Sequence, residues 1–389
     1  MRRRLSTALI IACAATAVFA GVQQGDAKPP PRAPKGFFGI DPQTVLTDRD
    51  AEYMVAGGIS SVRWPLPWSS VQPTPRGGFN WSGFDPVVEV AAKHGLSVLP
   101  FLYGTPAWIA RKPTKLPIDN AKARAAWKAF LRAAVKRYGP GGDFWKLHSH
   151  AAVPPVPGGI GVPYETEPVL PPVTILKPTP IRTWQVWNEA NFFYFAYPVS
   201  PQRYARLLKI STPTIKGADP GAKVILTGLF GEPTAGAARG MPAAKFLEIL
   251  YKTPGIKSLF DGIALHPYAV DAETLEELVE ALHEVTVKNH DRVPLYITEM
   301  GWGSQNDFFH DAFEQGLKGQ VKQLQDSYAY LLENRNRLDL KQVYWYSWRD
   351  LKNSCDFCDS VGFFHEGTSF HAKPSWRAFV ALTHGRVRP

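Results

Sequence analysis

The sequence predicts an α/β protein built as a single (β/α)8 TIM barrel. Apolar, strand-like runs alternate with amphipathic helical runs eight times along the 389 residues, which is the pattern of repeated βαβ units. Two of these runs, 224–226 and 343–346, are apolar without interruption, as expected of parallel strands that are covered on both faces. The chain length and a hydrophobic content of 45% are sufficient for one large core.

The predicted strands are, in chain order, residues 37–40, 61–64, 96–103, 183–187, 224–229, 262–265, 295–298 and 343–348. Between the later strands, apolar side chains recur at helical spacing and predict two helices whose apolar faces cover the barrel. The first stripe is Leu275, Leu278, Val279, Leu282 and Val285, and the second is Leu317, Val321, Leu324, Tyr328, Leu331 and Leu332.

One region interrupts this alternation. Residues 139–180 are rich in proline and glycine and predict an irregular insertion between the third helix and the fourth strand. Because a helix-to-strand connection lies at the N-terminal face of a barrel, the insertion is expected to start and end away from the catalytic face. We assign residues 36–385 to one catalytic domain that contains it.

The N-terminus is typical of a secretory signal peptide. Arg2, Arg3 and Arg4 precede an apolar stretch that ends near Ala20 at small residues, so residues 1–20 predict a leader and a secreted protein. Residues 21–35 form a Pro-rich lead-in. The alternative is a lipoprotein attached through Cys13, but apolar sequence continues past this cysteine, where a mature lipoprotein normally turns polar.

Charge and cysteine content exclude other classes. Lys and Arg number 44 against 34 for Asp and Glu, but they are dispersed, so we predict no nucleic-acid partner. No apolar segment is long enough for a comfortable membrane span. Cys355 and Cys358, which follow the last strand in a C-x-x-C spacing, are candidates for a small disulfide ring. Metal-binding and nucleotide-binding motifs are missing, so we predict neither a metal nor a cofactor.

Two glutamates carry the functional prediction. Glu189 ends the run I-R-T-W-Q-V-W-N-E, and Glu299 ends the run P-L-Y-I-T-E. In a barrel, the C-terminal ends of the strands converge on one mouth, so both carboxyl groups are expected there. A pair of carboxyl groups is what a glycosidase needs, whereas either glutamate alone is as well explained by a salt bridge or a loop cap.

Other residues at predicted strand ends complete a candidate sugar site. We expect substrate contacts from Arg63, Asn188, His266, Tyr268, Trp302 and Trp348, with Trp348 as the floor under the sugar. For His266 a hydrogen-bonded core residue is an equal alternative, and for Trp348 the alternative is barrel core. The further indoles Trp64, Trp68, Trp108 and Trp187 are candidates for additional subsites, because pyranose rings present apolar faces to indoles.

These motifs resemble those of retaining glycoside hydrolases of clan A, in particular families 39 and 5. The resemblance spans nearly the whole mature chain and depends on W-N-E-A-N at 187–191, H-P-Y at 266–268 and T-E-M-G-W at 298–302. The family usually has proline after the first catalytic acid, whereas this chain has Ala190.

The resemblance implies that Glu189 is the general acid and base and that Glu299 is the nucleophile. It also implies that Asn188 binds the sugar 2-hydroxyl, and that the carboxyl groups lie about 5 to 5.5 Å apart. We expect hydrolysis of β-linked glycosidic bonds in a polysaccharide or oligosaccharide. The alternatives are a transglycosylase that uses the same glutamates and a non-catalytic carbohydrate-binding barrel. The sequence does not define the oligomeric state, and we take a monomer by default.

Overall fold

The described strands close into a barrel. The computed structural model describes residues 31–149, 175–233, 239–306, 311–352, 354–355 and 357–389. Its strands form one parallel sheet in the order β5-β4-β3-β2-β1-β9-β8-β7-β6, so strands that follow one another in the chain are neighbours in space. They are β1 (Phe38–Asp41), β2 (Ser61–Pro67), β3 (Ser97–Tyr103), β4 (Thr183–Val186), β5 (Lys223–Ile225), β6 (Leu229–Phe230), β7 (Ile263–His266), β8 (Leu295–Met300) and β9 (Leu340–Tyr346).

The predicted fifth strand is divided into β5 and β6. Ile225 forms an isolated parallel bridge with Gly262, and the amide of Leu226 donates to the carbonyl of Gly262 at 3.0 Å. Gly228 instead forms a bridge with Asn188 at the end of β4. The divided strand thus contacts both of its neighbours and closes the ring, which confirms the predicted (β/α)8 barrel.

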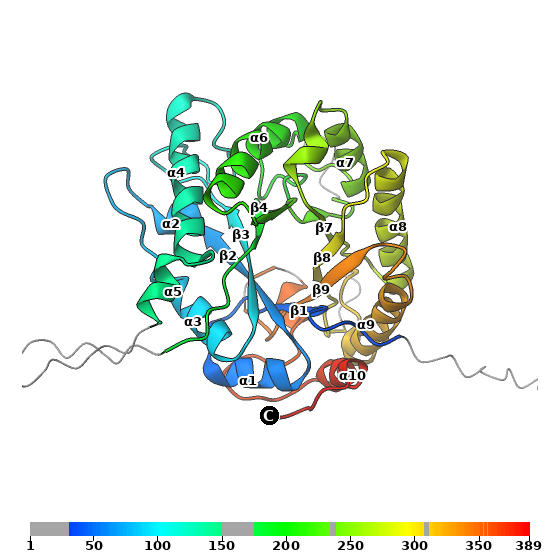
Figure 1. Cartoon of the computed structure of the whole chain (residues 1–389). Helices are drawn as coiled ribbons and strands as arrows, with labels where there is room; N and C mark the ends of the chain where they lie inside the picture. Colours follow the sequence, from blue (N-terminus) through cyan, green and yellow to red (C-terminus); the bar gives the residue numbers. More distant parts are fainter. Residues whose placement is uncertain (1–30, 150–174, 234–238, 307–310, 353, 356) are drawn as a thin grey trace, which may run out of the picture.

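Helices surround the sheet on its outer side (Figure 1). They are α1 (Asp48–Ala56), α2 (Trp68–Val71), α3 (Asp85–Lys93), α4 (Ala121–Tyr138), α5 (Asp143–Leu147), α6 (Pro201–Ala218), α7 (Ala243–Tyr251), α8 (Ala272–Lys288), α9 (Gly316–Glu333) and α10 (Pro374–Thr383). The predicted stripes lie on α8 and α9. Leu275, Val279 and Leu282 are buried in α8, as predicted. Leu317 in the first turn of α9 is 42% exposed, so the prediction that it belongs to the apolar face of that helix was wrong.

The predicted insertion has a described beginning and end. α5 occupies residues 143–147, so this part is helical and not irregular. Residues 150–174 lie outside the described residues. On either side of them, the amide of Leu176 donates to the carbonyl of His148 at 3.0 Å, and that of Ile181 to the carbonyl of Tyr138 at 2.9 Å. These bonds bring the two ends together before β4, at the N-terminal end of the strand.

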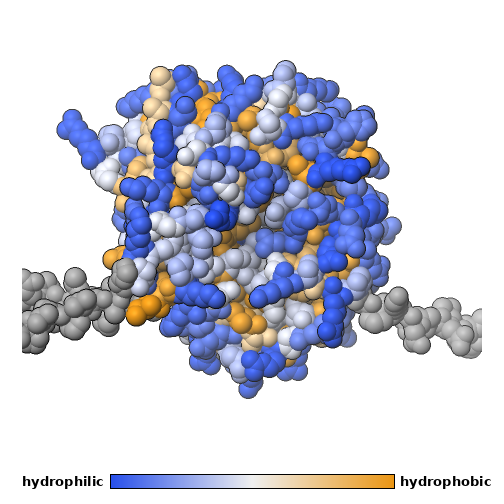
Figure 2. All heavy atoms as spheres, viewed as in Figure 1, coloured by the Kyte–Doolittle hydropathy of each residue, from blue (hydrophilic) through white to orange (hydrophobic). Residues whose placement is uncertain are grey.

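Two other sequence predictions concern the N-terminus and the membrane. The predicted leader, Cys13 and residues 21–30 of the lead-in lie outside the described residues and stay predictions. Among the helices of the described chain, none is both long enough and apolar enough to cross a membrane. On the face seen in Figure 2, hydrophilic residues cover most of the surface, with apolar residues between them.

A buried ion pair joins α1 to the segment after β9. Asp50 accepts hydrogen bonds from Nη2 of Arg349 at 2.7 Å and from Nε1 of Trp348 at 2.8 Å. Asp50 is 2% exposed and Arg349 is 7% exposed. The same carboxylate also takes part in the cap of α1, because it accepts a hydrogen bond at 3.1 Å from the amide of Thr47, the N-cap residue. The first helix and the last strand connection are therefore held together by one carboxylate.

We expect Asp50→Asn to lower the free energy of unfolding by about 3 kcal/mol, because it leaves the buried Arg349 charge without its anionic partner. Urea denaturation followed by circular dichroism measures this loss. Asp48→Asn in the same helix is the matched control. Asp48 pairs with Lys93 at the surface, where both side chains are about half exposed, so its loss should be about 1 kcal/mol or less. Equal losses in the two variants would contradict the assignment.

Candidate active site

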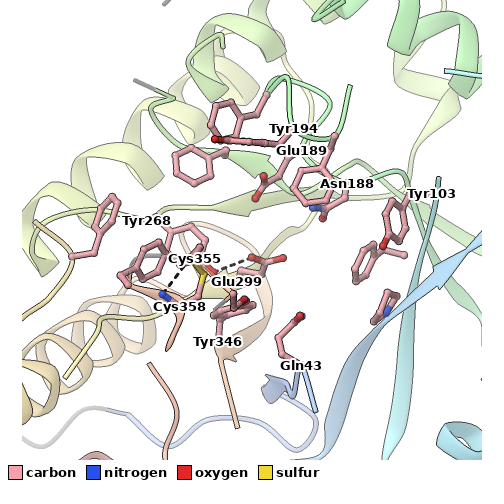
Figure 3. Close-up of a pocket in the computed structure, with 18 of the residues that line it drawn as sticks. Gln43, Tyr103, Asn188, Glu189, Tyr194, Tyr268, Glu299, Tyr346, Cys355 and Cys358 are labelled. Carbon is pink, nitrogen blue, oxygen red and sulfur yellow. Dashed lines mark hydrogen bonds between the residues drawn. A yellow bond between two sulfur atoms is a disulfide. The ribbon is translucent and has the colours of Figure 1, made fainter. Parts of the chain in front are cut away.

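A cavity of about 810 Å³ opens at the C-terminal ends of the strands. Both predicted glutamates line it, Glu189 just after β4 and Glu299 near the end of β8. Figure 3 shows the two carboxyl groups facing this space together with Asn188, Tyr268 and Tyr346. The position is the one that barrel enzymes use for chemistry.

The two carboxyl groups are close to one another. One oxygen of Glu189, one oxygen of Glu299 and a ring nitrogen of His266 all lie within 4.8 Å of each other. Inverting glycosidases hold their carboxyl groups about 6.5 to 9.5 Å apart so that a water fits between them, whereas retaining enzymes hold them at about 5 to 5.5 Å. The nearest oxygens of the two carboxyl groups are therefore closer than the gap that holds a water in inverting enzymes.

Arg63 of β2 is a buried hub for the site. Its Nη1 donates to Glu299 at 2.5 Å and to Asp41 at 2.6 Å, its Nη2 donates to Asn188 at 2.6 Å, and its Nε donates to Gln185 at 2.8 Å. The side chain is 0% exposed. One guanidinium therefore connects the ends of β1, β2, β4 and β8 and fixes the orientation of the Asn188 amide.

Glu299 has polar partners on both oxygens. Tyr268 donates its hydroxyl hydrogen to Oε2 at 2.9 Å, and Arg63 donates to Oε1. Burial raises the pKa of Glu299 to about 7, while the charge of Arg63 and the hydrogen bond from Tyr268 act in the opposite direction. These two contacts favour the ionised form of Glu299 within a site that otherwise opposes charge.

Glu189 has an uncharged partner instead. Nδ1 of His266 lies 2.7 Å from Oε1 of Glu189. Burial lowers the pKa of His266 well below its usual value, and the charge of Arg63 lowers it further, so the ring is neutral. Burial also raises the pKa of Glu189 well above its usual value, with a second contribution from the charge of Glu299. Both shifts favour the state in which the imidazole is neutral and Glu189 carries the proton.

His266 fits its place because residue 228 is glycine. A Cβ at Gly228 would lie 1.9 Å from Nε2 of His266. A larger residue would push the ring away from Glu189. Nε2 also lies 3.5 Å from Oε1 of Glu299, so the imidazole is positioned between the two carboxyl groups.

The backbone after β4 is strained where it presents the site. Trp187 has φ 74° and Glu189 has φ 38°, a region that non-glycine residues rarely adopt. The amide of Ala190 donates to Oγ1 of Thr227 at 3.0 Å and helps to hold this turn. Successive side chains of a regular strand point to opposite faces. Here Asn188 and Glu189 both line the cavity.

Other predicted residues are not brought to the cavity. Trp302 and Trp348 are 1% and 0% exposed and lie outside the cavity lining. Trp302 donates to the carbonyl of Ala269, and Trp348 donates to Asp50, so both are core residues and their predicted substrate contacts are not retained. The same lining contains none of the other predicted indole subsites, namely Trp64, Trp68, Trp108 and Trp187.

Sequence reasoning missed several residues of the site. Tyr346, the last residue of β9, lines the cavity in the place expected for Trp348, because the strand ends two residues before that tryptophan. Asp41 ends β1, so the strand-end argument used for the other residues would have found it. Gln185 and Gln43 carried no comparable signal.

Glu189, His266 and Glu299 are close enough to hold a metal ion. Their contacts fit roles as an acid and a nucleophile better than roles as metal ligands. Arg63 already lies 2.5 Å from Glu299, and a buried guanidinium opposes a second cation at the same oxygen.

Cys355 and Cys358 form a disulfide at the rim and also line the cavity.

Solved structures of glycoside hydrolases share this architecture. A family 39 glycoside hydrolase from Bacteroides cellulosilyticus WH2 is 19% identical with a TM-score of 0.62, and the match covers 89% of this chain and 63% of that one. A monomeric beta-xylosidase from Caulobacter crescentus CB15 is 16% identical with a TM-score of 0.60, covering 92% and 69%. GH5_18 from Streptomyces cattleya, solved in complex with GlcNAc, is 14% identical with a TM-score of 0.60, covering 91% and 80%.

No protein-family model matches the chain, and no curated protein matches it in sequence. The chain spans less than two thirds of the length of the first of these structures. At these identities the similarity concerns the fold. The chain therefore has the (β/α)8 barrel fold that family 39 and family 5 glycoside hydrolases share.

Proposed function

We propose that the chain is a secreted retaining glycoside hydrolase in which Glu299 is the nucleophile and Glu189 is the acid and base. The observation that carries the proposal is the pair of buried carboxyl groups in one cavity, within 4.8 Å, with a cation beside one and a neutral imidazole beside the other. Environments that separate the pKa values of two carboxyl groups define an acid and a base.

In the first step, a carboxylate oxygen of Glu299 bonds to the anomeric carbon while the glycosidic C–O bond breaks. The proton of Glu189 passes to the departing oxygen. In the second step, the Glu189 carboxylate takes a proton from water, the water oxygen bonds to the anomeric carbon, and the ester to Glu299 breaks. Each enzyme group returns to its starting state, and the anomeric configuration is retained.

The neighbouring residues have matching roles in the proposal. Arg63 and Tyr268 stabilise the Glu299 carboxylate, and His266 positions Glu189. Asn188, which Arg63 orients, is placed to bind the sugar 2-hydroxyl. Secretion is supported by the leader-like residues 1–20 and by the disulfide, since disulfides persist in oxidising compartments.

The first test uses matched substitutions of the two acids. Glu299→Gln should abolish turnover, because no ester intermediate can form. Glu189→Gln should lower kcat/KM about 10²- to 10⁴-fold for alkyl glycosides, and far less for a dinitrophenyl glycoside, whose leaving group needs no proton. Glu232→Gln, an exposed glutamate after β6, is the control and should leave kcat/KM unchanged.

A labelling experiment identifies the covalent intermediate. A 2-deoxy-2-fluoro glycoside should label the peptide that contains Glu299, as measured by mass spectrometry, and NMR should show the initial product with retained configuration. Inverted product, or labelling elsewhere, would rule out the assigned roles.

The second test is the pH dependence of kcat/KM. Activity requires ionised Glu299, so kcat/KM should rise with pH through about 7, where the coupled pair first loses a proton. It should fall again at higher pH as Glu189, whose pKa is raised further, loses its proton.

Tyr268→Phe should shift the acidic limb of this profile upward by about one pH unit, because it removes a hydrogen bond that favours the charged form of Glu299. Tyr346→Phe alters a second tyrosine of the same cavity that has no hydrogen bond to Glu299 among the described contacts, and it should leave the limb in place. An acidic limb that Tyr268→Phe does not move would show that Glu299 does not control it.

A further inference from the structure

A continuous row of aromatic rings lines one side of the cavity. Successive ring centroids along it are 5.0, 5.2, 5.6, 5.3 and 5.0 Å apart, which is ordinary contact distance for aromatic pairs. The row extends from the loop after β4, across β6 and β7, to the loops after β8 and β9. We refer to it as the aromatic belt, and its members are Tyr194, Phe192, Phe230, Tyr268, Phe357 and Phe313.

The belt offers little to a sugar. Four of its six rings are phenylalanine, which has no hydrogen-bonding group. The hydroxyl of Tyr268 is already bonded to Glu299. A sugar placed along the belt could stack an apolar face on a ring, but the phenylalanine rings would offer no partners to its hydroxyls, and a hydroxyl that loses water without gaining a partner is unfavourable. Apolar groups lose nothing there and gain from burial.

A set of polar groups lies elsewhere in the cavity. Gln43, Asn188 and Tyr346 line the cavity near Glu299 (Figure 3). They can serve the sugar ring that Glu299 attacks. One end of the belt is formed by Tyr194 and Phe192, and Phe192 is three residues after Glu189 in the sequence. Figure 3 shows Tyr194 beside Glu189. Because Glu189 protonates the departing oxygen, the group attached to that oxygen has to lie near Glu189, and this end of the belt is close by.

The charge and the volume of the cavity restrict the class of leaving group further. The ionisable acids among the described lining residues are Glu189, Glu299 and Asp311, and none of those lining residues is a lysine or an arginine, so the described lining offers no cation to an anionic leaving group. A volume of about 810 Å³ is within the range of pockets that enclose one small molecule, about 300 to 1,000 Å³. That volume accommodates a sugar together with a substituent on its anomeric oxygen.

We propose that the natural substrate is a monosaccharide glycoside of an uncharged alkyl or aryl alcohol, whose apolar aglycone packs along the aromatic belt. The inference rests on the proposed glycosidase function and departs from the polysaccharide substrate that the sequence suggested. It makes the belt the specificity determinant for the leaving group.

The test compares octyl and methyl β-glycosides of the same sugar, chosen from a panel of xylosides, glucosides and mannosides. Both leaving groups are primary alkanols with similar reactivity, so the ratio of their kcat/KM values reports contacts with the alkyl chain. Each buried methylene should contribute about fourfold, so three or more buried methylenes should give a ratio above about fiftyfold.

Substitutions in the belt should lower that ratio. Tyr194→Ser and Phe192→Ser remove rings from its rim and should each reduce the octyl-to-methyl ratio about three- to tenfold, because they take away contacts with the octyl chain that a methyl group cannot make. Tyr197→Ser is the matched control. Tyr197 is in the same loop and is 49% exposed, but it lies outside the cavity lining, so the ratio should stay at the wild-type value.

Four results would overturn the inference. A ratio near one, or faster cleavage of a disaccharide than of the octyl glycoside, would reject the apolar aglycone and leave the glycosidase function standing. An octyl preference that survives both belt substitutions would reject the belt as its cause. If no glycoside in the panel is cleaved and no fluoroglycoside labels Glu299, the proposed function fails together with the inference.

Discussion

The site depends on the buried guanidinium of Arg63. Removing a charge this completely from water costs several kcal/mol, and the cost is offset only if nearly all of its donors are satisfied. Asp41, Gln185, Asn188 and Glu299 supply that satisfaction from three other strands. The planar fork of arginine can reach acceptors in several directions at once, which a lysine could not do. Displacement of one strand end would therefore disturb all the others.

The two glutamates show how the same side chain can hold opposite states. Both are buried, and burial alone would protonate both. Glu299 faces Arg63 and Tyr268, whereas Glu189 faces a histidine that is itself kept neutral by burial and by the charge of Arg63. Arg63 thus acts twice. It favours the charge on Glu299 directly, and it adds to the effect of burial in lowering the pKa of His266, although its charge also lowers the pKa of Glu189.

Patterns local in sequence predicted much of this structure, and contacts between distant segments account for the rest. The strand-end rule placed Glu189 and Glu299 at the mouth because parallel strands share one direction. It failed for Trp348, since β9 ends at Tyr346 and the chain turns the tryptophan toward Asp50. Nothing in the sequence indicated that Gly228 must be small, because its reason is a ring from another strand.

The aromatic belt links specificity to the pKa values of the site. Its rings come from strand β6 and from the loops after four other strands, which is why no local pattern revealed it. Burial is the largest cause of the raised pKa of both glutamates, and the belt supplies much of the apolar lining that buries them. Rings that would hold an apolar leaving group would also help to exclude water from Glu189 and so favour its protonated form. A more polar belt would weaken both effects at once, so leaving-group preference and acid strength are coupled in this barrel.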